Sequence, residues 1–248
     1  MVRTARVKSS SGIYHVMLRG INKQLILEDE EDHRKLKEVL RQCKERCGYQ
    51  LYAYCFLGNH VHLLIKEGKE SLEQIFKRIG ARYVYYFNQK YKRVGHLFQD
   101  RFKSEPIEDD DYLLTVVSYI HNNPVKAGLS KTVDGYQWSS YSEYMESSSF
   151  VDVDFVLGMI PREQFMELHN KEIQDSILDI GEDNFRITDA EAILMVKEVC
   201  GVDTCSKVVS MDIANRNVYV KELREKGLSI RQISRVTGIG KSIIEKLK

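Results

Sequence analysis

The chain has 248 residues, of which 43% are hydrophobic and 29% are charged. This length suits one large domain or two modest ones, and the apolar content excludes a chain that is disordered as a whole. No apolar run approaches the ~18–20 residues that cross a bilayer, and the basic N-terminus lacks the apolar core of a secretion signal. The five cysteines form no CxxC pair. We therefore expect reduced thiols, no membrane association and a cytoplasmic location.

Charge is distributed unevenly along the chain, although the formal net charge is only +1. Residues 1–145 carry a balance of +5, residues 146–205 a balance of −10 and residues 206–248 a balance of +6. Two basic blocks favour two parts that bind a polyanion, separated by a part that does not. A solvated acidic helical surface explains the middle block equally well.

The first 145 residues show the strand and helix signals of an α+β domain. β-rich apolar runs predict strands at residues 13–18, 51–56, 61–65 and within 98–107. Helical spacing predicts helices over residues 29–48, 71–91 and 110–123. The Gly58-Asn59 turn makes the second and third strands an antiparallel hairpin, and Pro124 is expected to stop the last helix. This order predicts a mainly antiparallel sheet with helices on one face.

A histidine pair follows the hairpin turn, in the run Asn59-His60-Val61-His62. Side chains alternate between the two faces of a strand, so His60 and His62 project from the same face. Two imidazoles on one face can hold one divalent metal. Two histidines on a solvated strand face, with no ligand, are the more common arrangement.

A tyrosine and an amide lie four residues apart at the end of the predicted helix over 110–123. Tyr119 and Asn123 therefore share a helix face, one turn apart. An amide oxygen at Asn123 can complete a metal site that two histidines begin. Tyrosine is a weak nucleophile because its pKa is ~10, but beside a metal it can attack a phosphate and form a covalent intermediate. The alternative for Tyr119 alone is a half-buried helix residue with a hydrogen-bonded hydroxyl.

Five motifs keep their order and spacing over about residues 10–145: HVMLRG (15–20), YCFLGNHVHLLI (54–65), GHLFQDRFKS (95–104), YIHNNPVKAGL (119–129) and WSSY (138–141). Together they resemble the REP-associated tyrosine transposases, which belong to the single-tyrosine HUH transposases. The resemblance implies a ferredoxin-like catalytic domain over residues 1–145. It also implies that Tyr119 is the nucleophile, that His60 and His62 hold Mg or Mn, and that Asn123 is the third ligand.

The implied activity is cleavage and rejoining of single-stranded DNA at a hairpin or repeat. Tyr119 would attack the scissile phosphate, keep the 5′ end as a phosphotyrosine and release a 3′-hydroxyl, which can later rejoin the strands without ATP. Two alternatives remain at this point: a domesticated nucleic-acid-binding protein that keeps only the fold, and a metal-dependent hydrolase without a covalent step. Whether the tyrosine helix serves its own metal site or that of a partner in a homodimer also stays open.

Basic residues within the motifs are candidates for DNA contacts: Arg19, Arg101, Lys103 and Lys126. Arg101 and Lys103 alternate with Phe98 and Phe102, a mixture of cations and aromatic rings that suits DNA backbone charge and base stacking. The alternatives are a carboxylate partner for Arg19 and core positions for the phenylalanines.

The C-terminal residues 228–244 have the spacing of a helix-turn-helix. Ser229 and Gln232 form a capping-box pattern, Gly238 fits the turn, and residues 240–248 fit a recognition helix. The stretch over 193–248 looks like the DNA-binding domain of the bacterial replication initiator. Expected contacts to duplex DNA are Arg231, Lys241, Ser242 and Lys246. We thus predict an all-α DNA-binding domain over 188–248, joined to the catalytic domain by an acidic helical connector over 146–187; a bundle for protein contacts is the alternative.

Overall fold

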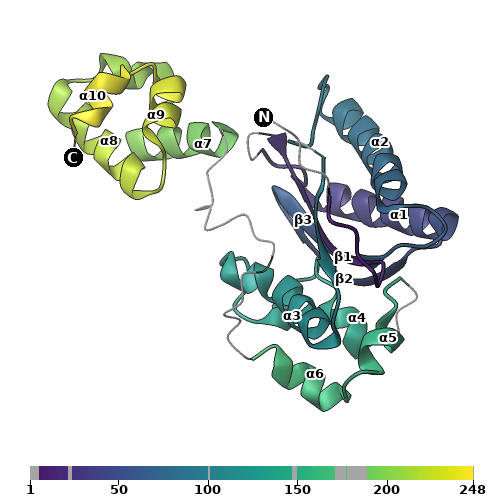
Figure 1. Cartoon of the computed structure of the whole chain (residues 1–248). Coiled ribbons are helices and arrows are strands. Elements are labelled where there is room, and N and C mark those ends of the chain that lie inside the picture. The colour runs from purple at the N-terminus through teal and green to yellow at the C-terminus, as the bar shows by residue number, and fades with distance from the viewer. Residues whose placement is uncertain are drawn as a thin grey trace. The chain divides into compact units, whose positions relative to one another are not determined.

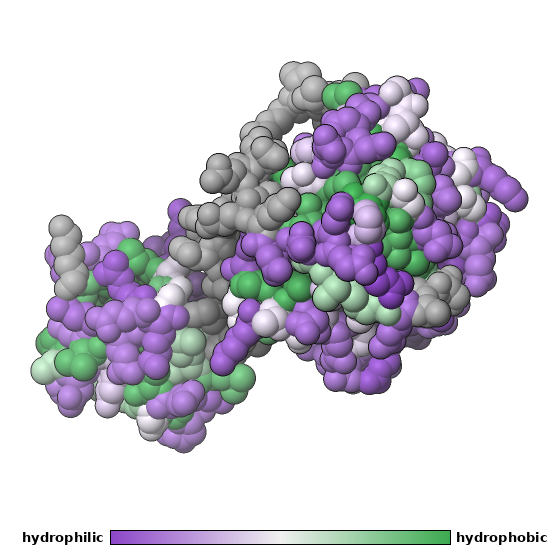
Figure 2. Space-filling model, turned by 90° about the horizontal axis from the view of Figure 1, so that it is seen from below, coloured by the Kyte–Doolittle hydropathy of each residue, from purple (hydrophilic) through white to green (hydrophobic). Residues whose placement is uncertain are grey.

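The computed structural model describes residues 6–21, 24–99, 101–146, 150–170, 177 and 189–247. The chain divides into two compact units, Met1–Ile180 and Gly181–Lys248, which are described separately below (Figure 1). Within the described residues, no helix has the length and apolar character needed to cross a bilayer. The surface seen in Figure 2 is mostly hydrophilic, with apolar residues showing in patches on both units.

The first unit is built on a four-stranded antiparallel sheet in the order β2-β3-β1-β4. Its strands are β1 (Ile13–Arg19), β2 (Gln50–Leu57), β3 (His60–Lys66) and β4 (Lys103–Ile107). The Gly58-Asn59 turn joins β2 to β3, as the sequence predicts. This strand order, with one helix after β1 and one after β3, confirms the expected ferredoxin-like fold.

Three long helices accompany the sheet: α1 (Glu30–Cys47), α2 (Leu72–Lys90) and α3 (Asp110–Lys126). Helices α1 and α2 pack together on one face, as expected, whereas α3 contacts β2 and β3 from the opposite face (Figure 1). The expected arrangement has the helices on one face only. The difference has a physical reason: six consecutive residues of β1, residues 13–18, are buried, so both faces of the sheet require a cover.

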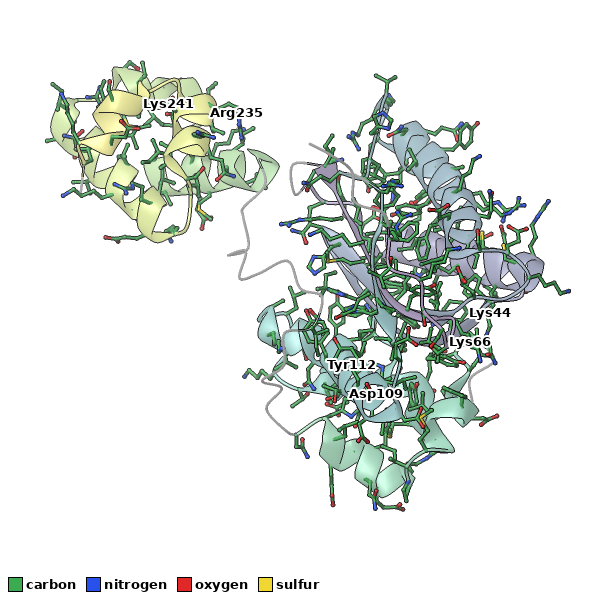
Figure 3. All side chains as sticks on the ribbon, in the orientation of Figure 1. Lys44, Lys66, Asp109, Tyr112, Arg235 and Lys241 are labelled. Atoms are coloured by element: carbon green, nitrogen blue, oxygen red, sulfur yellow. The ribbon has the colours of Figure 1, made fainter. Side chains whose placement is uncertain are left out.

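Local signals set the helix ends. Helix α1 begins at a capping box between Asp29 and Asp32 and ends at Gly48, whose φ of 68° lies in the left-handed region that glycine adopts easily. The side chain of Asp109 accepts a hydrogen bond from the backbone of Tyr112 at 2.7 Å and so caps the start of α3 (Figure 3). The expected stop at Pro124 is wrong, because α3 includes Pro124 and runs on to Lys126. A proline in the last turn removes only one helical hydrogen bond.

The predicted acidic connector over 146–187 is helical where it is described, with α5 (Val153–Leu157) and α6 (Arg162–Leu168) after the short α4 (Tyr141–Met145). Residues 150–170 nevertheless belong to the first unit. Phe150, Val156 and Phe165 are buried in its core, and their burial fixes this segment against the sheet and α3 layers. The exact domain limits stay a prediction.

Over residues 189–247, where it is described, the second unit is all-α, as expected, and contains α7 (Asp189–Cys200), α8 (Ile213–Glu225), α9 (Ile230–Thr237) and α10 (Lys241–Glu245). A 3₁₀ turn, Cys205–Ser210, lies between α7 and α8. The unit has a separate apolar core that includes Val196, Leu223, Ile233 and Ile244. A separate core of this kind is what allows a unit to fold independently.

Candidate active site and nucleic-acid interface

One face of the sheet carries a group of polar side chains from its two central strands. The β1–β3 register pairs Arg19 with His60 and Met17 with His62. Residues that pair directly across antiparallel strands share a face, and alternate residues along a strand do so as well. His15, Arg19, His60 and His62 therefore project from one face, which we call the histidine face. Helix α3 covers this face.

Tyr119 of α3 lies against the histidine face within its own chain. Its ring centroid is 5.7 Å from that of His62 and 5.9 Å from that of His15, and both contacts are edge-on. The His60 and His62 rings are 5.0 Å apart. Tyr119 is only 2% exposed. The structure thus brings together the predicted histidine strand and the predicted tyrosine without a second copy of the chain.

His62 is held by a hydrogen bond at one ring nitrogen only. Its Nδ1 lies 2.9 Å from Nε2 of His15, while its buried Nε2 has no hydrogen-bond partner among the described residues. Nδ1 of His15 lies 3.7 Å from a carboxylate oxygen of Glu105 on β4. Burial, together with the nearby His60 and His15, holds the pKa of His62 well below its usual range. His62 is therefore a neutral imidazole, the form that binds metals.

Asn123 and Lys126 follow Tyr119 on α3. The side-chain amide nitrogen of Asn123 donates to the carbonyl oxygen of Tyr119 at 2.9 Å, which directs the amide along the helix. The ammonium group of Lys126 lies 4.6 Å from the centre of the Tyr119 ring. A cation over an aromatic face interacts favourably with it, and would do so more strongly if the phenol lost its proton.

The side chains beside Tyr119 offer few protein ligands for a metal ion. Within the described parts of the chain, no three side chains of His, Cys, Asp or Glu form a metal-holding group. His60 and His62 supply two imidazoles, so any third protein ligand has to be of another type, such as the amide of Asn123. A buried polar atom without a partner is costly. The unpartnered Nε2 of His62 is therefore the observation that fits a bound cation.

The predicted DNA-contact residues of the first unit are spread over one end of the sheet. Arg19 stands opposite His60 in the register, Lys103 begins β4, and Lys126 is exposed at the end of α3. Arg101 is exposed in the segment before β4. Phe98 and Phe102 are partly buried against the core and partly accessible. Each ring therefore packs against the core on one side and leaves some of its surface available for base stacking.

Sequence reasoning missed a buried polar chain behind the tyrosine. Nδ1 of His121 lies 2.8 Å from Nε2 of His169, and Nε2 of His121 lies 2.7 Å from Oγ of Ser140. Nδ1 of His169 lies 2.7 Å from the carbonyl oxygen of Phe165. Burial lowers the pKa of His169 to about 4 and holds that of His121 well below its usual range, with His169 adding to the effect on His121.

These neutral side chains have only one consistent proton arrangement. The carbonyl of Phe165 can only accept, so His169 donates from Nδ1 and accepts at Nε2. His121 then donates from Nδ1 to His169 and accepts at Nε2 from the hydroxyl of Ser140, whose 2.7 Å contact with His121 is shorter than its 3.3 Å contact with the carbonyl oxygen of Tyr54. These hydrogen bonds connect α3 to α6 at His121, two residues beyond Tyr119. The position of His121 within the motif YIHNNP was the only sequence signal for it.

The second unit contains the expected helix pair. The Ser229–Gln232 capping box is formed at the start of α9, and Gly238 has a φ of 81° in the turn. Helix α10 covers Lys241–Glu245 and is shorter than the expected 240–248. All four predicted contact residues are exposed: Arg231, Lys241, Ser242 and Lys246. Figure 3 shows Arg235 on α9 and Lys241 on α10, and Arg235 adds a further exposed cation.

Known proteins share both sequence and fold with this chain. The family model "Transposase IS200 like" matches residues 8–123. A REP-associated tyrosine transposase of Haemophilus influenzae is 30% identical in an alignment of 119 residues, and the alignment covers 43% of this chain and 67% of that protein. The chain belongs to this family. A solved structure described as a REP-associated tyrosine transposase bound to a REP hairpin aligns with a TM-score of 0.51 at 19% identity, over 62% of this chain and 90% of that chain, and so has the same fold.

Membership of the REP-associated tyrosine transposases makes this chain an enzyme of the transposase class. The matched residues 8–123 contain His60, His62, Tyr119 and Asn123. The helical second unit lies outside the match to the family model. Its helix pair is therefore judged on its own geometry and charge.

Proposed function

We propose that this transposase is a metal-dependent single-stranded DNA endonuclease and strand transferase that acts through a 5′-phosphotyrosine on Tyr119. The observation that carries the proposal is the packing of the Tyr119 ring against His15 and His62 of the same chain. This arrangement also supports a site that assembles within one chain rather than between two subunits.

Two imidazoles and one amide are the proposed ligands of a divalent cation, Mg or Mn. They are His60, His62 and Asn123, and water and substrate oxygens would complete the coordination that such ions prefer. Bound there, the cation would polarise the scissile phosphate and offset its charge. Glu105 and His15 have a positioning role: a proton on Nδ1 of His15, facing Glu105, lets Nε2 of His15 accept from Nδ1 of His62. Nε2 of His62 is then free of a proton and can bind metal.

The protein's part in the chemistry is to supply the phenol and to stabilise its anion. The Tyr119 oxygen forms a bond to phosphorus as the bond to the 3′-oxygen breaks. The phenol releases its proton to water and the 3′-oxygen takes one up from water, so the protons balance. Lys126, close to the Tyr119 ring, favours the phenolate. The same steps in reverse, with a 3′-hydroxyl as nucleophile, rejoin the strand. The bonds made and broken are alike, so no ATP is needed.

The proposed substrate is a DNA hairpin or repeat with an adjacent single strand. A family member with the same fold is described as bound to a REP hairpin, and we extend this substrate class to the present chain. We propose in addition that the second unit binds duplex DNA through α9 and α10. Its support is the capped helix pair with exposed cations on both helices.

Trapping the covalent intermediate tests the proposal directly. Wild-type protein with Mn and a labelled hairpin with a single-stranded tail should give a denaturation-resistant adduct that maps to Tyr119. Tyr119→Phe should bind the same DNA and give no adduct. Tyr85→Phe, at an exposed tyrosine of α2, is the control and should retain the adduct. Cleavage without any adduct would indicate a hydrolase, and binding without cleavage in the wild type would indicate a domesticated DNA-binding protein.

A further inference from the structure

A cavity of about 320 Å³ lies on the side of the sheet opposite the histidine face. Helix α2 contributes Phe76, Lys77 and Gly80 to its lining, and the segment before β4 contributes Phe98 and Phe102. This volume is at the lower end of the range for small-molecule sites, which is room for a single heterocycle. We call this feature the edge pocket; its remaining lining residues are Arg6, Leu18, Glu73 and Arg101.

Aromatic and planar groups dominate the walls of the edge pocket. The rings of Phe76 and Phe102 are 4.6 Å apart, and the guanidinium of Arg6 stacks 3.7 Å from the centre of the Phe102 ring. Phe98 makes no ring–ring contact with any other described residue, and it is only partly buried. Rings and guanidinium planes are the surfaces on which unpaired bases stack.

Gly80 keeps the pocket open. A Cβ built at this position would meet no atom within 4 Å. Glycine inside a helix costs roughly 0.5–1 kcal/mol relative to alanine. A larger residue at position 80 would therefore suit α2 better and would project into empty space at the pocket.

Positive charge surrounds the pocket. Lys77 and Arg101 are exposed, and neither forms an ion pair within the part of the chain that the structure describes. Arg6 pairs with Glu73 at 2.9 Å. The pocket rim thus has two cations in excess. A nucleotide matches this combination of aromatic walls and positive charge, because it joins a planar aromatic base to a negatively charged phosphate.

The edge pocket is connected to the histidine face through β1. Leu18 lines the pocket, and the next residue, Arg19, projects from the histidine face. The backbone nitrogen of Gln99 donates to the carbonyl oxygen of Arg19 at 2.9 Å. Phe98 and Gly20 form an isolated antiparallel β-bridge. Pocket and candidate active site therefore share one end of the sheet and are separated by the sheet itself.

We propose that the edge pocket binds one unpaired base of the DNA strand whose neighbouring segment occupies the histidine face. The base stacks on Phe98 and on the Phe102–Arg6 pair, and the phosphates beside it lie near Lys77 and Arg101. Glu73 can accept a hydrogen bond from a base amino group, which favours adenine, cytosine or guanine over thymine, because only thymine lacks such a group. This inference deepens the proposed function and rests on it for the position of the rest of the strand.

The test separates the base from the phosphates. Binding of an oligo(dA) strand is compared with that of an abasic strand of the same length, by fluorescence anisotropy. In the wild type, the strand with bases should bind at least about 5-fold more tightly, which is the lower end of the gain expected from stacking a single base. Phe98→Ala should reduce this ratio toward one while binding of the abasic strand stays unchanged. Tyr85→Ala, an exposed aromatic on the same helix as Gly80, is the control and should keep the wild-type ratio.

A second variant fills the pocket without removing a ring. Gly80→Leu should reduce the ratio as Phe98→Ala does, and circular dichroism should show that its helices are retained. Arg101→Gln should weaken both strands equally, because it removes a phosphate contact. The proposal is overturned if Phe98→Ala and Gly80→Leu both keep the wild-type ratio, or if they weaken the two strands equally.

The outcome is independent of the covalent chemistry. A Tyr119 adduct in the wild type, combined with unchanged ratios in both pocket variants, would reject the edge pocket and keep the proposed function. Reduced ratios in a protein that forms no adduct would support base binding and reject the strand-transfer chemistry.

Discussion

The buried polar chain between α3 and α6 leads to a stability prediction that follows from named contacts. The change is His169→Leu, which introduces an apolar side chain of similar size and removes both ring nitrogens. It leaves the donor of His121 and the carbonyl of Phe165 without their present partners. Each buried polar group without a partner costs about 1–3 kcal/mol, so the two together should lower the free energy of unfolding by about 2–6 kcal/mol.

Urea unfolding of the full chain, followed by far-UV circular dichroism, measures this loss. At a denaturant slope of about 2 kcal/mol per molar, a loss of that size moves the midpoint of the first unit down by about 1–3 M. The second unit has its own core and should unfold at its wild-type midpoint, so it is an internal control. The double variant His121→Leu/His169→Leu removes donor and acceptor together and should be less destabilised than the sum of the single variants. Strictly additive losses, or an unchanged midpoint for His169→Leu, would refute the hydrogen-bond chain.

Three further predictions follow from the same structure. The first concerns pH: because the pKa of His169 is lowered to about 4 in the folded protein, the unfolded state takes up its proton first as the pH falls through about 6.5. The wild type should therefore lose stability between about pH 6.5 and pH 4, and His169→Leu should show a flatter pH profile of the urea midpoint; identical profiles would contradict the assignment. The second is that Glu105→Gln should raise the Mn concentration needed for half-maximal adduct formation about 10- to 100-fold, because the proton arrangement at His15 and His62 is no longer fixed; an unchanged Mn titration would exclude this role. The third is that removing residues 189–248 should weaken hairpin binding and its salt dependence more than it slows adduct formation on saturating DNA, since the lost contacts are to phosphates; loss of the adduct at saturation would show that the second unit takes part in the chemistry.

The sequence was informative where a short-range period decides the geometry. His60 and His62 had to share a face because strand side chains alternate, and Tyr119 and Asn123 had to share a face because four residues make about one helical turn. The capping box at Ser229 and the left-handed turn at Gly238 are equally local, and both were predicted. The family motifs then placed these short pieces in one fold.

The parts that sequence reasoning missed depend on contacts between distant segments. Nothing around His169 indicates that its ring meets His121, 48 positions earlier in the chain. The acidic composition around Phe165 suggested a solvated connector, although a few apolar residues were enough to bury that segment. Pro124 was expected to end α3, but a local rule cannot weigh one lost hydrogen bond against the packing of the whole helix on the sheet.

The separate cores of the two units have a consequence for how such a protein can change. The exposed side chains of α9 and α10 cover the core of the second unit, and no residue of the sheet belongs to that core. Substituting these exposed side chains therefore leaves the core of the first unit unchanged. If the second unit binds duplex DNA as proposed, a change of target sequence requires substitutions in this small helical unit alone, while the strands and the tyrosine helix keep their arrangement. Recombination that replaces everything beyond residue 188 would then change the DNA target and leave the proposed catalytic unit unchanged.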